Sequence, residues 1–266
     1  MAHRSAGTLA LPWSQPSNQR LGKQRVPADH TLLAVTMILA LLGLVMVFSA
    51  SAIVAGNRFQ DSGFFLKRQI AWLAFGLLLM HLASRVDYTV WKKLSVPILI
   101  CMVGLLVIVL VPSIGVAAKG ARRWLRIGPI SMQPAEMVKL VVVIYMAAYL
   151  AKKGEKITLF REGLLPGLIV IGLLSGLVLL EPDLGTVVVL GLVTVGMWFL
   201  AGARIPHLLA LGLGAIPVAL VLVLGSSYRR QRLMTFLAPW KDASDGGFQI
   251  TQSFLSFGSG GPFGVG

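Results

Sequence analysis

The sequence predicts an all-α polytopic membrane protein, and three observations favour this fold class. Of its 266 residues, 56% are hydrophobic and only 13% are charged, against about 25% charged in an ordinary soluble domain. The mean hydropathy is +0.81. The apolar residues gather in runs of about 20, the length that a helix needs to cross a bilayer. Together these observations exclude a soluble globular protein, a disordered chain and a collagen-like fibre.

A polar segment precedes the first apolar run. Residues 1–30 are rich in Ser, Pro and Gln and predict a disordered cytoplasmic tail. The run 31–54 ends in S-A-S-A, which resembles a signal-peptidase site, but its length favours a retained membrane helix. Further spans are expected at 68–84, 95–115, 135–151, 163–180, 184–202 and 206–225. The sequence therefore predicts three parts: the tail (1–30), a bundle of about seven helices (31–225) and an extracytoplasmic loop with an interfacial helix (226–266).

The formal net charge is +14, from 24 Lys and Arg against 10 Asp and Glu. No long basic stretch with interleaved aromatic residues lies outside the apolar runs, so a nucleic-acid partner is not expected. Basic residues flank the first span and several later helix ends, which favours a cytoplasmic tail. Two basic clusters, 119–126 and 228–232, then lie outside. Either they contact lipid headgroups of the outer leaflet, or they bind an anionic ligand such as a diphosphate through bidentate arginines.

Acidic residues in or beside membrane helices are costly and are therefore functional candidates. Glu136 and Lys139 share a helix face, which favours an ion pair. In the alternative, Glu136 stabilises the helix N-terminus and Lys139 extends to the interface. Glu181 and Asp183 flank a proline in a predicted turn. Capping of the next helix would explain Asp183 but not Glu181.

The segment after the last span carries two aspartates and a polar stripe. Asp242 and Asp245 follow the second basic cluster. A carboxylate there could act as a general base beside arginines that stabilise an anionic leaving group, although spacing alone favours a solvated aspartate. Gln249, Gln252 and Ser253 recur at helical spacing. They predict a short interfacial helix that presents hydrogen-bonding groups to a polar cavity.

No other chemistry is visible in the sequence. Motifs for a nucleotide site, a metallohydrolase or a serine hydrolase are lacking, and the four histidines are too scattered to suggest a metal site. The lone cysteine, Cys101, cannot form a disulfide within the chain.

Four motifs follow one another along the chain. They are V-F-S-A-S (47–51), G-A-R-R-W-L-R-I-G-P-I-S-M-Q-P-A-E-M-V-K-L (120–140), E-P-D-L-G-T (181–186) and Y-R-R-Q-R-L-M-T-F-L-A-P-W-K-D-A-S-D-G-G-F-Q-I-T-Q-S (228–253). In this order and topology they resemble the SEDS family, the membrane glycosyltransferases that polymerise bacterial peptidoglycan. The E-P-D motif and the P-W before Asp242 are more similar to the FtsW branch, which acts in division, than to the RodA branch, which acts in elongation.

The resemblance implies that the intact protein polymerises lipid II into glycan strands at the outer face of the bacterial cytoplasmic membrane, at the division septum. It implies that Asp242 is the general base and that Arg229 and Arg232 bind the diphosphate. Other positions match the surroundings of the family's central cavity: Arg122, Arg123, Glu136, Lys139 and Asp183. The alternatives are a transporter that flips lipid II and a scaffold that recruits division proteins.

The resemblance also implies partners, and the sequence departs from the family in two ways. Expected partners are lipid II, the growing glycan strand, a class B penicillin-binding transpeptidase, other division proteins and membrane lipids. A divalent cation, Mg²⁺ or Mn²⁺, could screen the diphosphate, although no residues specify a metal site. The family usually has a proline where Ala243 stands, which lessens the rigidity of the loop. Its members have about ten helices of membrane-spanning length, so the chain resembles an N-terminal fragment, and activity is expected of the intact protein.

Overall fold

The computed structural model describes residues 29–118, 121–128, 130–244, 246–261 and 264. The chain divides into two compact units, Met1–Val86 and Asp87–Gly266, and each is described by itself. Nearly all of the predicted tail, residues 1–28, lies outside the described residues.

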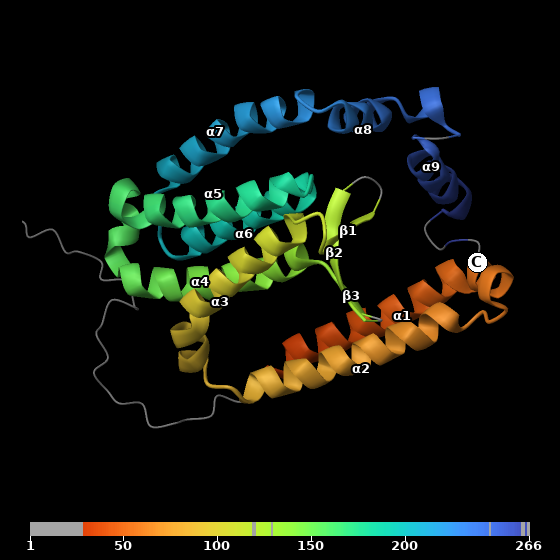
Figure 1. Cartoon of the computed structure of the whole chain (residues 1–266), viewed down its shortest axis with the longest axis horizontal. Coiled ribbons are helices and arrows are strands. Elements are labelled where there is room, and N and C mark those ends of the chain that lie inside the picture. Colours follow the sequence, from red (N-terminus) through yellow and green to blue (C-terminus); the bar gives the residue numbers. More distant parts are fainter. Residues whose placement is uncertain (1–28, 119–120, 129, 245, 262–263, 265–266) are drawn as a thin grey trace, which may run out of the picture. The chain divides into compact units, whose positions relative to one another are not determined.

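The described part of the first unit is a helical hairpin (Figure 1). Helix α1 spans His30–Phe59 and helix α2 spans Phe64–Arg85. Across the turn between them, Phe59 stacks on Phe64 with 4.2 Å between the ring centroids. Among the residues of these two helices, only Ala55 is buried. The apolar surface of the hairpin is therefore left for lipid or protein to cover.

The second unit contains a packed helical core. Its helices are α3 (Tyr88–Leu110), α4 (Pro134–Lys153), α5 (Leu165–Leu180), α6 (Leu184–Leu200), α7 (Ile205–Leu224), α8 (Ser227–Leu237) and α9 (Phe248–Gly260). A 3-10 turn at Gly154–Thr158 and a π-helical turn at Phe160–Leu164 join α4 to α5. Helix α4 packs against α3 and α6, and α5 packs against α6. Aliphatic side chains fill the space between these helices, and Val142, Leu174 and Leu190 are fully buried there.

Helices α1 to α7 occupy the predicted apolar runs, which confirms the all-α polytopic fold class. In the described part of the chain, six helices are long and apolar enough to span a membrane, and α6, with 17 residues, is shorter. The predicted bounds 95–115 are wrong at both ends. Asp87 caps α3 by accepting a hydrogen bond of 2.8 Å from the Thr89 backbone N–H, so the helix begins earlier, at Tyr88. It ends at Leu110, where a sheet follows.

A three-stranded antiparallel sheet, which the sequence did not predict, joins α3 to α4. Its strands are β1 (Gly115–Ala118), β2 (Ala121–Ile127) and β3 (Ile130–Met132), with β2 in the centre. Val116 of β1 pairs with Trp124 of β2, and the next residue of β1, Ala117, pairs with Arg122. Arg123, between Arg122 and Trp124, therefore has no partner residue on β1. Such a β-bulge changes the direction in which a side chain points.

The segment after α7 is helical in two places. The predicted short helix is present as α9, and α8, a helix that the sequence did not predict, precedes it. A 3-10 turn, Pro239–Asp242, packs against both α8 and α9. This turn is therefore held between two helices.

Candidate functional site at the sheet end of the second unit

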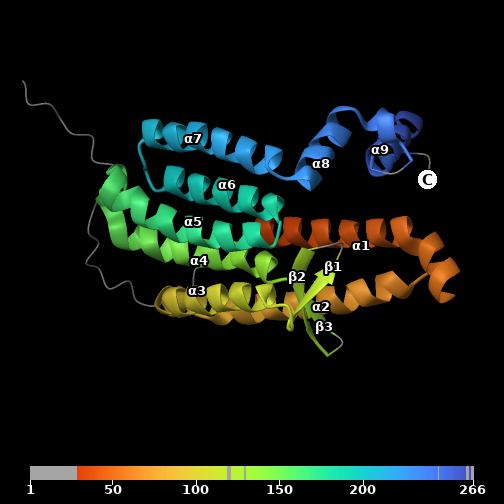
Figure 2. The same ribbon diagram turned by 45° about the horizontal axis from the view of Figure 1, so that its top comes forward.

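The candidate residues on β2, at the start of α4 and in the E-P-D turn lie at one end of the helices of the second unit, here called the sheet end. Successive spans run in alternating directions, so α4 and α6 begin at this end and α3, α5 and α7 finish there (Figure 2). Strand β2 contacts both α3 and α4. The sheet end thus carries the sheet, the E-P-D turn between α5 and α6, and the beginning of α8.

Arg123 holds the E-P-D turn by its backbone. The β-bulge directs its guanidinium across the sheet end, where Nε donates to the carbonyl oxygen of Glu181 over 2.7 Å. Nη2 of the same guanidinium donates to the carbonyl oxygen of Pro182 over 2.6 Å. Hydrogen bonds from a charged donor are stronger than neutral ones. Arg123 therefore fixes the turn to the sheet, and its predicted part in diphosphate binding stays a prediction.

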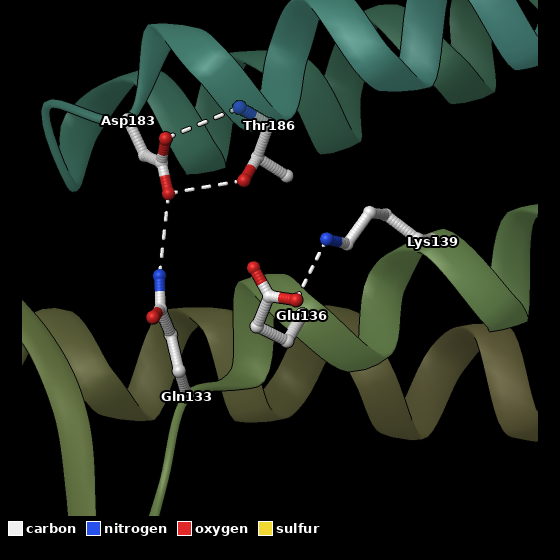
Figure 3. Close-up of polar contacts among 5 residues, drawn as sticks. All are labelled: Gln133, Glu136, Lys139, Asp183 and Thr186. Carbon is white, nitrogen blue, oxygen red and sulfur yellow. Dashed lines mark hydrogen bonds and ion pairs between the residues drawn. The ribbon is translucent and has the colours of Figure 1, made fainter. Parts of the chain in front are cut away.

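Asp183 both caps α6 and contacts the start of α4 (Figure 3). Its Oδ1 accepts from the Thr186 backbone N–H over 3.1 Å, and its Oδ2 accepts from the Thr186 hydroxyl over 3.0 Å. The capping role considered from the sequence is thus present. The side-chain amide of Gln133 donates to Oδ2 over 3.2 Å. Sequence reasoning missed Gln133, because its partner lies far away along the chain.

Glu136 and Lys139 form the ion pair expected from their spacing. Lys139 Nζ lies 2.7 Å from Glu136 Oε2 on the first turns of α4 (Figure 3). The Lys139 side chain is half-buried and the Glu136 side chain is exposed. A lysine within a membrane helix is costly unless it has a partner, and Glu136 supplies one.

Glu181 is a buried acid whose carboxylate has no hydrogen-bond partner. Its exposed fraction is 0%, and neither Oε1 nor Oε2 meets a donor among the described residues. Burial, and to a smaller extent the neighbouring Asp183, raise the pKa of this carboxyl, Arg123 opposes them, and the net result is a pKa of about 7. Glu181 was not among the predicted site residues. The only signal in the sequence was that helix capping could explain Asp183 alone.

Arg229 on α8 is a half-buried arginine without a partner. Its Nε and Nη1 are buried and meet no acceptor among the described residues. Arg232, one turn further along α8, lies over the Tyr228 ring with 5.9 Å between the guanidinium carbon and the ring centroid. Arg230, between them in sequence, is exposed. Within the described part of the chain, Arg229 is thus a cation partly withdrawn from water, with two nitrogens that meet no acceptor.

The predicted catalytic residue, Asp242, is the last residue of the 3-10 turn between α8 and α9. The placement of its side chain is outside what the structure describes, as is the whole of Asp245. On α9 the predicted polar residues Gln249, Gln252 and Ser253 are exposed. The turn therefore links the arginines of α8 to the polar stripe of α9 through short stretches of chain.

The described residues do not form a divalent cation site. Among them, no group of three or more His, Cys, Asp or Glu side chains could hold a metal ion. Two of the carboxylates at the sheet end are also already engaged, because Asp183 caps a helix and Glu136 pairs with Lys139. Glu181 alone does not make a metal centre, and these residues do not fit one.

Comparison with known proteins identifies one family. The family model for FtsW, RodA and SpoVE, described as cell cycle protein, matches residues 29–266. A probable peptidoglycan glycosyltransferase FtsW from Geobacter sulfurreducens is 41% identical over 238 residues, which cover 90% of this chain and 64% of that protein. The stage V sporulation protein E of Bacillus subtilis is 39% identical, over 91% of this chain and 66% of that protein. The chain thus spans about two thirds of the length of these relatives.

Solved structures agree with this comparison. One of them bears the description "Structural coordination of polymerization and crosslinking by a peptidoglycan synthase complex". It matches with a TM-score of 0.60 and 32% sequence identity, over 83% of this chain and 66% of that one. The rod shape determining protein RodA of Thermus thermophilus matches with a TM-score of 0.51 and 31% identity, over 66% of this chain and 58% of that one.

Proposed function

Because the chain belongs to the FtsW, RodA and SpoVE family of cell cycle proteins, we propose that the whole protein is a peptidoglycan glycosyltransferase that acts in cell division. It is a multi-pass membrane protein. Its substrate is lipid II, which it polymerises into glycan strands at the outer face of the cytoplasmic membrane at the septum. Relatives named as probable peptidoglycan glycosyltransferases FtsW support this assignment.

Two buried nitrogens of Arg229, Nε and Nη1, meet no acceptor among the described residues, and this observation carries the proposal. Polar groups of a cation that are withdrawn from water are costly without a partner, so an anionic ligand would stabilise Arg229. The diphosphate of lipid II supplies one, and arginine binds phosphate oxygens by bidentate, charge-assisted hydrogen bonds. Arg232 lies one helical turn away on α8 and gives the diphosphate a second cation.

Asp242 is the proposed general base of the transfer. Its carboxylate takes the proton from the acceptor sugar hydroxyl as that oxygen forms a bond to the anomeric carbon of the donor chain. The bond between the anomeric carbon and the lipid diphosphate breaks, and the diphosphate leaves with the bonding electrons. Arg229 and Arg232 stabilise the negative charge that develops on the leaving group.

The rest of the sheet end supports this site and its partners. Arg123 and Asp183 hold the E-P-D turn to the sheet and to α4, and Arg122 adds a further exposed cation. The Glu136–Lys139 pair lies on the first turns of α4, and the exposed polar residues of α9 offer hydrogen bonds to the sugars. The structural relative that coordinates polymerization and crosslinking supports a class B penicillin-binding transpeptidase as the partner protein.

A polymerisation assay with the full-length protein, its transpeptidase partner and lipid II tests the proposal. General-base catalysis contributes about 10²- to 10⁴-fold, so we expect Asp242→Asn to lower the rate of strand synthesis by about that factor. Asp245→Asn, a matched change in the same loop, is expected to leave the rate within about twofold, a difference well below one kcal/mol. Equal rates for Asp242→Asn and the wild type would remove Asp242 from the mechanism.

The same preparation addresses the transporter alternative, which the intramembrane Glu136–Lys139 pair also suits. Lipid II translocation is measured in vesicles beside strand synthesis. Translocation without any strand synthesis by the wild-type protein would replace the enzyme assignment with a flippase.

A further inference from the structure

The exposed face of the sheet carries a groove that the proposed chemistry does not use. Along β2 the side chains beyond the bulge alternate, because Trp124 and Arg126 are exposed and Leu125 between them is buried. Val116 pairs with Trp124, and Ser131 pairs with Arg126 across the sheet. These four side chains line one shallow groove of about 210 Å³.

The chemistry of the groove is that of an aromatic platform beside hydrogen-bonding groups. Trp124 is 36% exposed, so its indole lies partly recessed among its neighbours. Arg126 and Ser131 offer a guanidinium and a hydroxyl at one end of the groove, and Val116 forms an apolar wall at the other. None of the four lining residues is acidic. The groove is therefore suited to a ligand with an apolar face, polar edges and negative charge.

We propose that this groove binds the nascent glycan strand, and this inference rests on the proposed function. The C–H face of a sugar ring packs on the Trp124 indole, and its hydroxyls exchange hydrogen bonds with the Ser131 hydroxyl and the Arg126 guanidinium. The stem peptides of an uncrosslinked strand end in carboxylates, with which Arg126 forms a charge-assisted pair. The groove thus holds the product after it leaves the reacting centre.

The position of the groove on β2 fits this role. Arg123, next to Trp124 in the strand, reaches the E-P-D turn, while Trp124 and Arg126 line the groove. One strand of the sheet therefore contacts the turn at the proposed site and the proposed path of the product. An indole recessed in a groove beside an arginine and a serine also differs from a tryptophan that anchors a protein in lipid, which extends into the headgroup region.

Binding of soluble glycan strands to the full-length protein in nanodiscs of phosphatidylcholine tests the inference. The probe is uncrosslinked strands with stem peptides, and the neutral lipid removes competition from anionic headgroups. We expect Trp124→Ala to raise the Kd about tenfold, as one lost packing contact predicts, and Trp124→Phe to stay within about twofold of the wild type. Arg126→Gln is expected to weaken binding of strands with stem peptides more than binding of strands without them.

Two matched variants serve as controls. Trp72→Ala removes an exposed tryptophan of α2, and Arg230→Gln removes an exposed arginine of α8, and both are expected to bind strands as the wild type does. Unchanged strand binding by Trp124→Ala overturns the inference. The inference is also overturned if Trp124→Ala keeps strand binding but loses binding to vesicles that contain phosphatidylglycerol. In that case the groove contacts lipid.

Asp242→Asn separates this inference from the proposed function. If that variant binds strands normally but does not make them, both hold. If the wild type polymerises lipid II but strand binding does not depend on Trp124, the groove assignment fails alone. If the wild type makes no strands, the proposed function fails whatever the groove binds.

Discussion

Two arginines at the sheet end of the second unit differ in what surrounds their guanidinium groups. Arg123 on β2 donates hydrogen bonds of 2.7 and 2.6 Å to two backbone carbonyls of the E-P-D turn. Arg229 on α8 has two buried nitrogens with no acceptor in the described residues. From the sequence both were expected to bind substrate. One arginine fixes the protein's own backbone, whereas the ligand-binding role that we propose for the other depends on its lack of such acceptors among the described residues.

The largest expected effect on stability follows from removing Arg123. Arg123→Ala leaves the carbonyl oxygens of Glu181 and Pro182 without their charged donor, and each such hydrogen bond contributes about 1.5 to 3 kcal/mol. We expect a loss of about 3 kcal/mol or more in the free energy of unfolding, measured by denaturant titration in detergent. Arg230→Ala, at an exposed position, is the control and is expected to change it little. Equal unfolding free energies of the two variants would show that Arg123 does not stabilise the E-P-D turn.

The next effect is a pH dependence that comes from Glu181. The folded state raises its pKa from 4.5 to about 7, chiefly by burial, so the folded state binds the proton more tightly than the unfolded state. Stability is therefore full below about pH 4.5 and falls as the pH rises to about 7, by about 3 kcal/mol at 1.36 kcal/mol per pKa unit. Glu181→Gln cannot ionise and is expected to lack this decline when unfolding is followed from pH 4 to pH 8. An identical decline in the variant would assign the pH dependence to other groups.

The smallest effect concerns the cap of α6. Asp183→Ala removes the acceptor of the Thr186 backbone N–H, and loss of such a cap costs about 1 kcal/mol. Asp183→Asn keeps an acceptor oxygen and is expected to restore most of that stability in thermal unfolding. A variant Asp183→Asn that is stable but inactive in strand synthesis would give the carboxylate charge a role in the reaction. Two equally active variants would limit Asp183 to capping.

The sequence allowed the helices to be predicted better than the contacts between them. Apolar runs of membrane-spanning length identified α1 to α7, and the helical spacing of Gln249, Gln252 and Ser253 identified α9. Strand β2 was missed because its A-R-R-W-L-R-I sequence is basic and half exposed, so it has the composition of a surface loop. Helix α8 was missed for the same reason, because every one of its first six residues except Tyr228 is polar or basic.

The candidate site could be predicted only in part. The Glu136–Lys139 pair depends on local helical spacing and was predicted. The contacts of Arg123 join residues 58 and 59 positions apart, and no local pattern specifies such a partner. The unpaired state of Arg229 is likewise a property of its surroundings in the fold. Sequence patterns therefore identified the charged residues, but only the fold shows which of them have partners within the protein.

The rate of strand synthesis by Arg229→Gln decides whether this arginine binds the diphosphate. Arg230→Gln is the matched control because it removes the same charge from the adjacent, exposed position. A lost hydrogen bond to a charged group of about 1.5 to 3 kcal/mol corresponds to a rate at least about tenfold lower. We expect this loss for Arg229→Gln, with an unfolding free energy equal to or above that of the wild type, and Arg230→Gln activity close to that of the wild type. Strand synthesis at the wild-type rate by Arg229→Gln would contradict it.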